Sequence, residues 1–361
     1  MSNFAIAVIP GDGIGREVTP AALEIAQKAA SIYGDTLDPT YFDWGTDYYL
    51  RQGAMMPADG VDQLRNFDAI LLGAVGHPDV ADHITLNGLL LPIRRDLDLF
   101  ANVRPSILYA GVESPLRSIS PGDVDMVVVR ENTEGEYSQV GGFVYKNQIN
   151  EVAVQTAVFT RRGVERIIRY AFELAQRRNQ RRKVTSVTKS NAQGFSMVLW
   201  DRVFEEVAAE YDGVETESLL VDAAALNFVR RPQTFDVVVA SNLFGDILSD
   251  LAAMVTGGLG LAASANIDPL RRCPSMFEPV HGTAPDIAGK GIANPIGSVF
   301  SAVMMLDHLG LMEAAKSMDS AAQSVLAEAR ARTPDLGGKS STVEVAQAVM
   351  SRLEQSGTAA V

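Results

Sequence analysis

The sequence predicts an α/β fold of about two domains that carries a small antiparallel arm. Short apolar runs typical of buried strands alternate with longer amphipathic segments typical of helices along most of the chain. The length of 361 residues is more than one hydrophobic core usually holds. The arm is expected at residues 135–160, where strand-like alternation is interrupted by turn residues.

The chain opens with a predicted strand at residues 4–9, the glycine-rich turn PGDGIG, and a helix at about residues 17–30. The glycines do not match the dinucleotide-binding motif G-x-G-x-x-G, because Arg16 occupies the position of the last glycine. We therefore expect a tight turn here and not a standard Rossmann site, although such a turn can still border a ligand. The next buried strand is expected at residues 69–72.

Three arginines are candidates for binding an anion. Arg94 and Arg104 lie in or beside apolar sequence, and Arg130 follows a predicted strand at residues 125–129. Open α/β sheets bind ligands at the carboxyl ends of their strands, and arginine is suited to bidentate binding of carboxylates. The alternative for each is a surface salt bridge, which is favoured for Arg95 because an aspartate follows it.

Two acids form a candidate metal site. Asp246 and Asp250 are four residues apart in a predicted helix that follows a short strand at residues 236–240. Positions i and i+4 lie on one helix face, so the pair offers oxygen ligands suited to Mg²⁺ or Mn²⁺. A solvated helix face is the alternative. The apolar neighbours from Ile247 to Val255 weigh against it, because an unpaired carboxylate in apolar surroundings is costly.

Further polar residues follow other predicted strands. Lys189 comes after a strand at residues 184–187, and Asp222 after one at residues 218–221. A lysine near acids is either a salt-bridge partner or a general base. Residues 277–295 are rich in Gly, Pro and polar residues, and long ordered loops are usually functional. Helices are expected at residues 162–178, 296–306, 314–330 and 341–353.

Composition limits the classes of partner. The formal net charge of −13 argues against nucleic acid and anionic membranes, since both attract positively charged proteins. No apolar run approaches the roughly 20 residues that a membrane span requires. The one cysteine, Cys273, cannot form an internal disulfide, and the N-terminus has no signal-peptide pattern. A cytoplasmic protein is expected.

Several long motifs, in one order over nearly the whole chain, resemble those of the β-decarboxylating hydroxyacid dehydrogenases. This family includes isopropylmalate, isocitrate and tartrate/D-malate dehydrogenases. The motifs are PGDGIGREV at 10–18, LPIRRDLDLFANVRP at 91–105, VVVRENTEGEY at 127–137, Lys189 with Asn191, SNLFGDILSDLAAMVTGGLG at 241–260, and EPVHGTAPDIAGKGIANP at 278–295.

The resemblance implies the isopropylmalate/isocitrate dehydrogenase-like fold, which has two α/β domains and is not a standard Rossmann fold. One domain, on the cofactor side, would consist of residues 1–100 and 256–361. The other, residues 101–255, would hold the metal, the substrate and the dimer contacts, and would include the arm. The family forms homodimers whose active sites are shared between subunits.

The resemblance also assigns roles in catalysis. Arg94, Arg104 and Arg130 match the residues that bind the substrate's carboxylates. Lys189, contributed by the partner subunit, matches the residue involved in deprotonating the hydroxyl. Tyr137 matches the acid that protonates carbon after CO₂ has left.

Metal and cofactor residues are implied in the same way. Asp246 and Asp250 of one subunit, with Asp222 of the other, match the ligands of Mg²⁺ or Mn²⁺. The residues that match the adenosine side of an NAD site are His281, Gly282, Thr283, Ala284, Asp286 and Asn294.

The segment ITLNGLLL at 84–91 resembles the tartrate/D-malate branch, and we expect Asn87 to contact the substrate's side group. Asn87 could instead only cap a helix. We expect oxidation of tartrate and/or D-malate by NAD with a divalent metal, with D-malate decarboxylated to pyruvate and CO₂. The alternative within the family is 3-isopropylmalate dehydrogenase. More remote alternatives are a metal-dependent lyase or phosphohydrolase and a non-catalytic dicarboxylate-binding protein.

Overall fold

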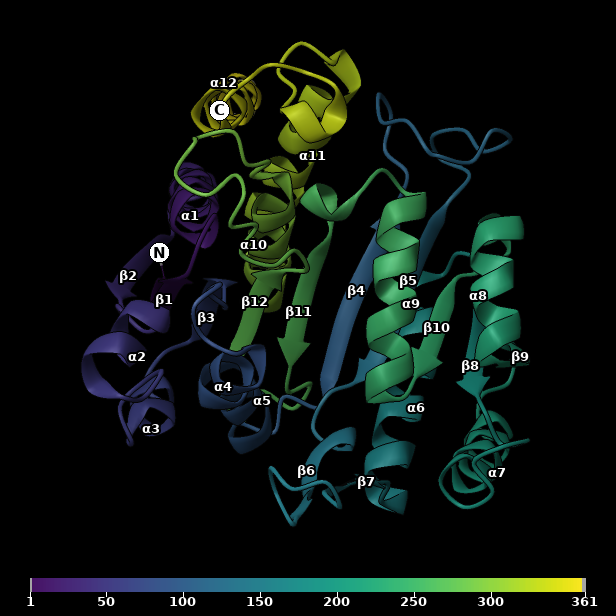
Figure 1. The fold of residues 1–361 in the computed structure, drawn as a ribbon. Helices are drawn as coiled ribbons and strands as arrows, with labels where there is room; N and C mark the ends of the chain where they lie inside the picture. Colours follow the sequence, from purple (N-terminus) through teal and green to yellow (C-terminus); the bar gives the residue numbers. More distant parts are fainter. Residues whose placement is uncertain (1, 359–361) are drawn as a thin grey trace.

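A computed structural model of the protein describes residues 2–358. Its centre is a sheet with the strand order β2-β1-β3-β12-β11-β4-β5-β10-β8-β9, flanked by helices (Figure 1). The strands are β1 (Asn3–Gly11), β2 (Thr36–Tyr41), β3 (Ala69–Ala74), β4 (Ala101–Ile107), β5 (Asp125–Glu131), β8 (Lys183–Thr188), β9 (Glu215–Leu220), β10 (Val237–Ala240), β11 (Ala263–Ile267) and β12 (Ser275–Pro279).

The described helices differ widely in length. The α-helices are α1 (Gly15–Ile32), α2 (Thr46–Gln52), α3 (Gly60–Leu64), α4 (Asp82–Thr85), α5 (Leu91–Asp96), α6 (Arg161–Arg178), α7 (Ser196–Ala208), α8 (Val221–Arg230), α9 (Asn242–Val255), α10 (Ile296–His308), α11 (Met312–Glu328) and α12 (Thr342–Thr358). A π-helical turn covers Leu86–Leu90, and short 3₁₀ turns cover Pro232–Thr234, Leu259–Leu261 and Pro334–Leu336. None of the helices in residues 2–358 is long and apolar enough to cross a membrane.

The two ends of the chain build one half of the sheet, and the middle of the chain builds the other. Strands β2, β1, β3, β12 and β11 come from residues before 75 or after 262, whereas β4, β5, β10, β8 and β9 come from residues 101–240. Around the junction, β4 pairs antiparallel with both β11 and β5, and β11 pairs antiparallel with β12, while the remaining neighbours pair in parallel. The α/β class is therefore confirmed, with a mixed sheet. The division into residues 1–100 with 256–361 and residues 101–255 stays a prediction.

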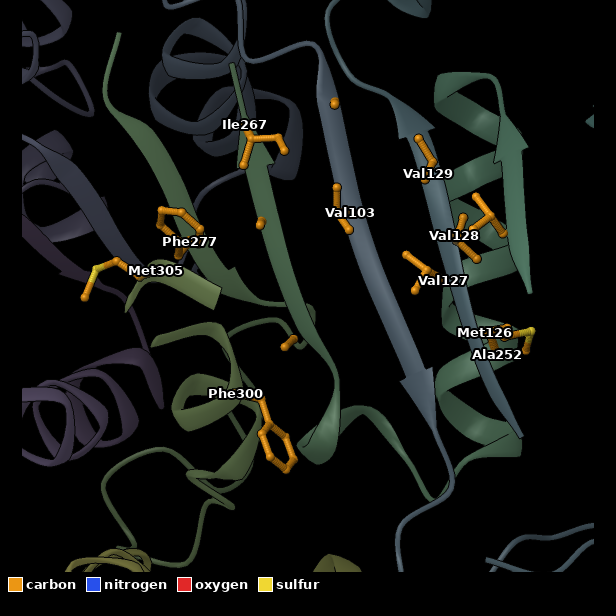
Figure 2. Packing of buried hydrophobic residues seen from close by; sticks show 14 of the residues in the cluster. Val103, Met126, Val127, Val128, Val129, Ala252, Ile267, Phe277, Phe300 and Met305 are labelled. Carbon is orange, nitrogen blue, oxygen red and sulfur yellow. The ribbon is translucent and has the colours of Figure 1, made fainter. Parts of the chain in front are cut away.

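One hydrophobic core runs across this junction. Its buried side chains come from β4, β5, β11 and β12 and from the helices α9 and α10, as Figure 2 shows. Val127, Val128 and Val129 of β5 are all buried, because a central strand of the sheet is covered on both faces. The continuous apolar run that predicted this strand is thus explained by its position.

The arm forms a sheet of its own. Strands β6 (Gly135–Val144) and β7 (Val152–Val158) pair antiparallel and separately from the large sheet, as expected for residues 135–160. Most of its residues are exposed in the single chain. An isolated hairpin of this kind is marginally stable in water, so it needs a surface to pack on.

Most other predicted elements are present, and the differences have physical causes. The strand predicted at 218–221 ends one residue earlier, so Asp222 lies in the first turn of α8. The edge strand β2 was missed because TLDPTY contains Pro and Asp, which are tolerated at a sheet edge. Strand β4 was missed because it contains Arg and Pro.

Candidate active site

A cavity of about 180 Å³ lies where several elements of the two sheet halves meet. Its wall contains residues of β3, β4, β5, β6, β12, α5 and α9, together with the π-helical turn. Among these residues are the predicted site residues Arg94, Arg104, Arg130, Tyr137, Asp246, His281 and Gly282. Residues that are up to 188 positions apart in the sequence therefore share one cavity.

The three arginines are almost completely buried and are held by different partners. Arg94, at the end of α5, forms an ion pair with Glu278 of β12. Arg104 donates from Nε to Asn102 at 2.7 Å and from Nη1 to Ser249 at 2.8 Å. These bonds use part of each guanidinium group and leave other N–H groups for a ligand, including the buried Nε of Arg94, which has no acceptor in the described residues.

Arg130 lies beneath the start of α9. It donates to the side-chain oxygen of Asn242 from Nε at 3.0 Å and from Nη2 at 2.7 Å, and its Nη1 forms an ion pair with Asp246. Burial lowers the pKa of Arg130 and of Arg104, because desolvation disfavours the charged form. Three buried cations close together thus require anionic partners.

Asp246 is held by positive and polar groups on several sides. Arg104 is 3.3 Å away, and the hydroxyl of Tyr137 donates to the other carboxylate oxygen at 2.9 Å. Burial acts to raise the pKa of Asp246, but the charges of Arg130 and Arg104 outweigh it and hold this pKa below its usual range. Asp246 is therefore an ionised carboxylate.

The local sequence explains how α9 presents this carboxylate. Strand β10 ends at Ala240, and Ser241 caps the N-terminus of α9 with its hydroxyl as acceptor for the backbone N–H of Phe244. Asp246 then lies about one turn into the helix, and Asp250 one turn further. The two acids therefore share a face, as predicted from their spacing.

The surroundings of Asp250 differ from the prediction. Leu248 and Ala252 are buried, but Ile247 and Met254 are exposed, and the Asp250 side chain is 56% exposed in the single chain. Partial burial and the negative charge of Asp246 raise the pKa of Asp250, against the effect of Arg104 at 3.8 Å. The expected apolar surroundings of Asp246 and Asp250 are therefore not found within one chain, because part of this helix face is exposed.

Tyr137 reaches the cavity from the first part of the arm. Burial raises the pKa of its hydroxyl, and the charge of Asp246 adds to this effect. The guanidinium group of Arg130 lies 5.2 Å from the centre of its ring. The phenol therefore keeps its proton at neutral pH and can donate it.

Lys189 and Asp222 lie together but do not line this cavity. The ammonium group of Lys189 is 2.6 Å from a carboxylate oxygen of Asp222, and this bond lowers the pKa of Asp222. Both residues are partly exposed beside the carboxyl ends of β8 and β9. Within one chain, these two predicted site residues therefore lie apart from the arginines and Asp246.

The predicted cofactor residues belong to an irregular loop, residues 280–295, which lies against the first glycine turn. The backbone N–H of Ile14 donates to the carbonyl of Thr283 at 3.0 Å. A side chain at Gly13 would clash with Thr283, because its Cβ would lie 2.1 Å from that carbonyl oxygen. A cavity of about 430 Å³ between the loop and the turn includes Asp12, Arg16 and Thr283.

The other loop residues lie in different positions. His281 is buried, and its Nε2 has no hydrogen-bond partner in the described residues. Asn294 is also buried and donates to Asp335 at 3.0 Å, while Asp286 is exposed. Ala284 has a φ of +42°, so the chain turns sharply after Thr283. Gly282 lines the cavity of the arginines, and the next residue, Thr283, lines the loop cavity, so the two cavities are neighbours.

Asn87 lies in the π-helical turn, a feature often found at functional sites. Its amide donates to the backbone carbonyl of His83 at 2.6 Å. The residues of this region that line the arginine cavity are Leu86, Leu90 and Leu91, not Asn87. Its predicted contact with the substrate stays a prediction.

Sequence reasoning missed four residues that hold the arginines. Each lies in a quoted motif but received no role: Asn102, Asn242, Ser249 and Glu278. The signal for Glu278 was an acid at the end of an apolar strand, where a buried charge requires a partner.

The residues fit a metal ion and a nicotinamide cofactor. Asp246 and Asp250 are oxygen donors of the kind that Mg²⁺ and Mn²⁺ prefer. No group of three or more His, Cys, Asp or Glu side chains suited to a metal occurs within residues 2–358. The unpartnered Nε2 of His281 and the loop cavity offer a place for a polar cofactor.

Comparison with known proteins agrees with this geometry. Residues 5–349 match the family described as isocitrate/isopropylmalate dehydrogenase. The chain is 52% identical over 357 residues to a probable tartrate dehydrogenase/decarboxylase of Bacillus subtilis, covering 98% of this chain and 99% of that protein. It is 50% identical over 356 residues to the decarboxylating D-malate dehydrogenase of Escherichia coli, covering 97% and 98%.

A solved structure has the same fold. The crystal structure of isocitrate dehydrogenase from Methylococcus capsulatus superimposes with a TM-score of 0.87 at 38% identity, covering 98% of this chain and all of that chain.

Proposed function

Because the chain belongs to the isocitrate/isopropylmalate dehydrogenase family, which generally uses a divalent metal and a nicotinamide cofactor, we propose that it oxidises D-malate and tartrate with NAD. D-malate is also decarboxylated, to pyruvate and CO₂. Relatives about 50% identical over nearly the full chain are named for these two substrates. The observation that carries the proposal is the group of three buried arginines around one cavity.

The charges around the cavity favour a dicarboxylate. Three carboxylates, those of Glu278, Asp246 and Asp250, balance the three guanidinium groups. A bound divalent cation would leave two positive charges in excess, which a substrate with two carboxylates neutralises. A monocarboxylate would leave one buried positive charge uncompensated, at a considerable cost.

Asp246 and Asp250 would hold the cation, which when bound acidifies the substrate's hydroxyl and stabilises negative charge on the adjacent oxygens. A nicotinamide cofactor, held by the residues of the loop cavity, would supply the hydride acceptor. Lys189 would take the hydroxyl proton, since its amine is the basic group that the family motif places at this step. Tyr137, whose raised pKa keeps it protonated, would deliver a proton to the carbon that loses CO₂.

NAD is proposed over NADP because of Asp286. Asp286 is exposed and directly follows Pro285, which lines the loop cavity. At this position its carboxylate would accept hydrogen bonds from the ribose hydroxyls of the cofactor. A 2′-phosphate at that position would be repelled.

A homodimer is proposed for two reasons. Exposed apolar side chains lie along α8 and α9, among them Leu226, Val229, Ile247 and Met254, and the arm exposes more. Lys189 and Asp222 pair with each other and do not line the cavity that holds the other site residues of their own chain. In the proposed dimer, α9 of one subunit faces this pair of the other.

A substrate panel tests the function. Purified protein with NAD and Mn²⁺ is assayed at 340 nm with D-malate, the tartrate stereoisomers, 3-isopropylmalate and isocitrate. We expect activity on D-malate and on one tartrate isomer, and much lower kcat/KM for the last two. Preference for 3-isopropylmalate would contradict the proposed substrate, and absence of NADH with every hydroxy acid would contradict the dehydrogenase function.

A further inference from the structure

A network of buried amides is connected to the arginines, and it consists of Asn266 of β11, Asn102 of β4 and Asn132, which directly follows β5. Its central member is Asn266 of β11, which is fully buried. In the antiparallel register, Asn266 lies opposite Asn102 of β4 on one side and opposite Met276 of β12 on the other. It is therefore positioned between the strands that carry Arg104 and Glu278.

The side-chain amide of Asn266 is fully hydrogen-bonded. Its Oδ1 accepts from Asn102 at 2.7 Å and from Asn132 at 2.9 Å. Its Nδ2 donates to Glu278 at 2.8 Å and to the backbone carbonyl of Met276 at 3.2 Å. An amide has two lone pairs and two N–H groups, and all four are used here. This pattern allows only one orientation of the amide.

Two branches connect this amide to the arginines. In one branch, Glu278 accepts from Asn266 and from Nη2 of Arg94 through the same oxygen, Oε1. In the other, Asn102 donates to Asn266 and accepts from Nε of Arg104. Asn266 therefore touches neither arginine, yet it fixes the partner of each.

We propose that Asn266 is a positioning residue that holds Arg94 and Arg104 in one common geometry for the two carboxylates of the substrate. This inference rests on the proposed function, since it concerns the recognition of a dicarboxylate. Long arginine side chains lose considerable entropy when they are held in place. An acceptor that is itself fixed removes this cost before the substrate binds, which favours binding.

Two substitutions separate the branches. Asn266→Leu removes all four hydrogen bonds and disturbs both arginines. Asn266→Asp keeps the oxygen that accepts from Asn102 and Asn132, but it replaces the N–H donor with a carboxylate oxygen that repels Glu278, so it should disturb the Arg94 branch. Ser301→Ala is the control, because the buried Ser301 hydroxyl donates to the carbonyl of Gly297, accepts from the backbone N–H of Ser264, and forms no hydrogen bond with Asn266 or an arginine among the described residues.

We expect Asn266→Leu to raise KM for D-malate about 10- to 100-fold, as for other residues that orient a ligand-binding group, with a much smaller change in kcat. Ser301→Ala should leave KM unchanged even if it lowers the melting temperature. A residue that only stabilises the fold would lower the active fraction, and hence kcat, without changing KM. That result for Asn266→Leu would overturn the inference.

Double-mutant cycles on kcat/KM complete the test, and they need only Asn266→Asp if the leucine variant does not fold. In an Arg94→Met background, adding Asn266→Asp should lower kcat/KM little further. In an Arg104→Met background, adding it should lower kcat/KM as much as it does in the wild type. Additive losses in both backgrounds would overturn the inference. A wild-type protein inactive on D-malate and tartrate would instead refute the proposed function, so the two failures are distinguishable.

Discussion

The hydroxyl of Tyr137 lies 2.9 Å from a carboxylate oxygen of Asp246 and donates a hydrogen bond to it. The other oxygen of Asp246 faces Arg130 and Arg104. One carboxylate therefore links a proton donor, two cations of the anion site and the proposed metal position. This arrangement separates the proposed roles, because each of these groups can be changed alone.

Asp250→Asn should weaken binding of Mn²⁺ and nearly abolish turnover, because a neutral amide is a poor ligand for a hard cation. It is a cleaner test than Asp246→Asn, since Asp246 also holds Arg130 and Tyr137. Titration calorimetry with Mn²⁺ and the NAD-linked assay measure the two effects. The exposed Asp212→Asn should behave like wild type. Full activity of the wild type in excess chelator would exclude a metal requirement.

Lys189→Met and Tyr137→Phe should impair different steps. Lys189→Met should slow oxidation of the hydroxyl by about 10²–10⁴, the usual worth of a positioned base. Tyr137→Phe should mainly impair the step after hydride transfer, which single-turnover measurements of NADH and of CO₂ resolve. Equal slowing of hydride transfer in both variants would show that the roles are not divided in this way.

Asp286 should determine the choice of cofactor. A 2′-phosphate about 4 Å from this carboxylate would cost roughly 4 kcal/mol per pair of unit charges at an effective dielectric constant near 20. Because Asp286 is exposed, screening will reduce this value, but a strong preference for NAD remains. Asp286→Lys with Ile287→Tyr should shift kcat/KM toward NADP. Equal kcat/KM of the wild type for both cofactors is the opposing result.

Mixed dimers test whether each active site uses two subunits. Dimers that combine one Lys189→Met subunit with one Asp246→Asn subunit should regain about half of the wild-type activity, because one of the two symmetry-related sites then has no substitution. Each homodimer should be inactive. The mixed dimer is isolated with two different affinity tags. No recovery would mean that Lys189 and Asp246 act within the same subunit.

Asn87→Leu should lower kcat/KM for tartrate more than for D-malate. Tartrate has a hydroxyl at C3 that an amide can bond, whereas D-malate has a hydrogen there. One amide N–H of Asn87 already donates to the carbonyl of His83, which leaves the amide oxygen and the second N–H for this bond. Gln323→Leu is the control, because this exposed residue of α11 also donates from its amide within its own helix. Equal losses for the two substrates would indicate that Asn87 only stabilises its helix.

The sequence by itself determined the features that depend on neighbours along the chain. The spacing of Asp246 and Asp250 places them on one helix face in any fold that keeps the helix. The alternation at 135–160 predicted the separate antiparallel arm, and the apolar run before Arg130 predicted a strand. These patterns are local, because they arise from the periods of the helix and the strand. Long motifs in one order were enough to indicate the family.

Only the tertiary structure decided which residues meet. The sheet places strands from the two chain ends side by side and joins them to strands from the middle, and no local pattern carries that order. It brings Glu278 to Arg94 and, through Asn266, links it to Asn102 and Arg104. In the sequence alone, Glu278, Asn266 and Asn102 read as ordinary polar positions. The exposure of Asp250 was also a matter of packing, since apolar neighbours in sequence are buried only where another element covers them.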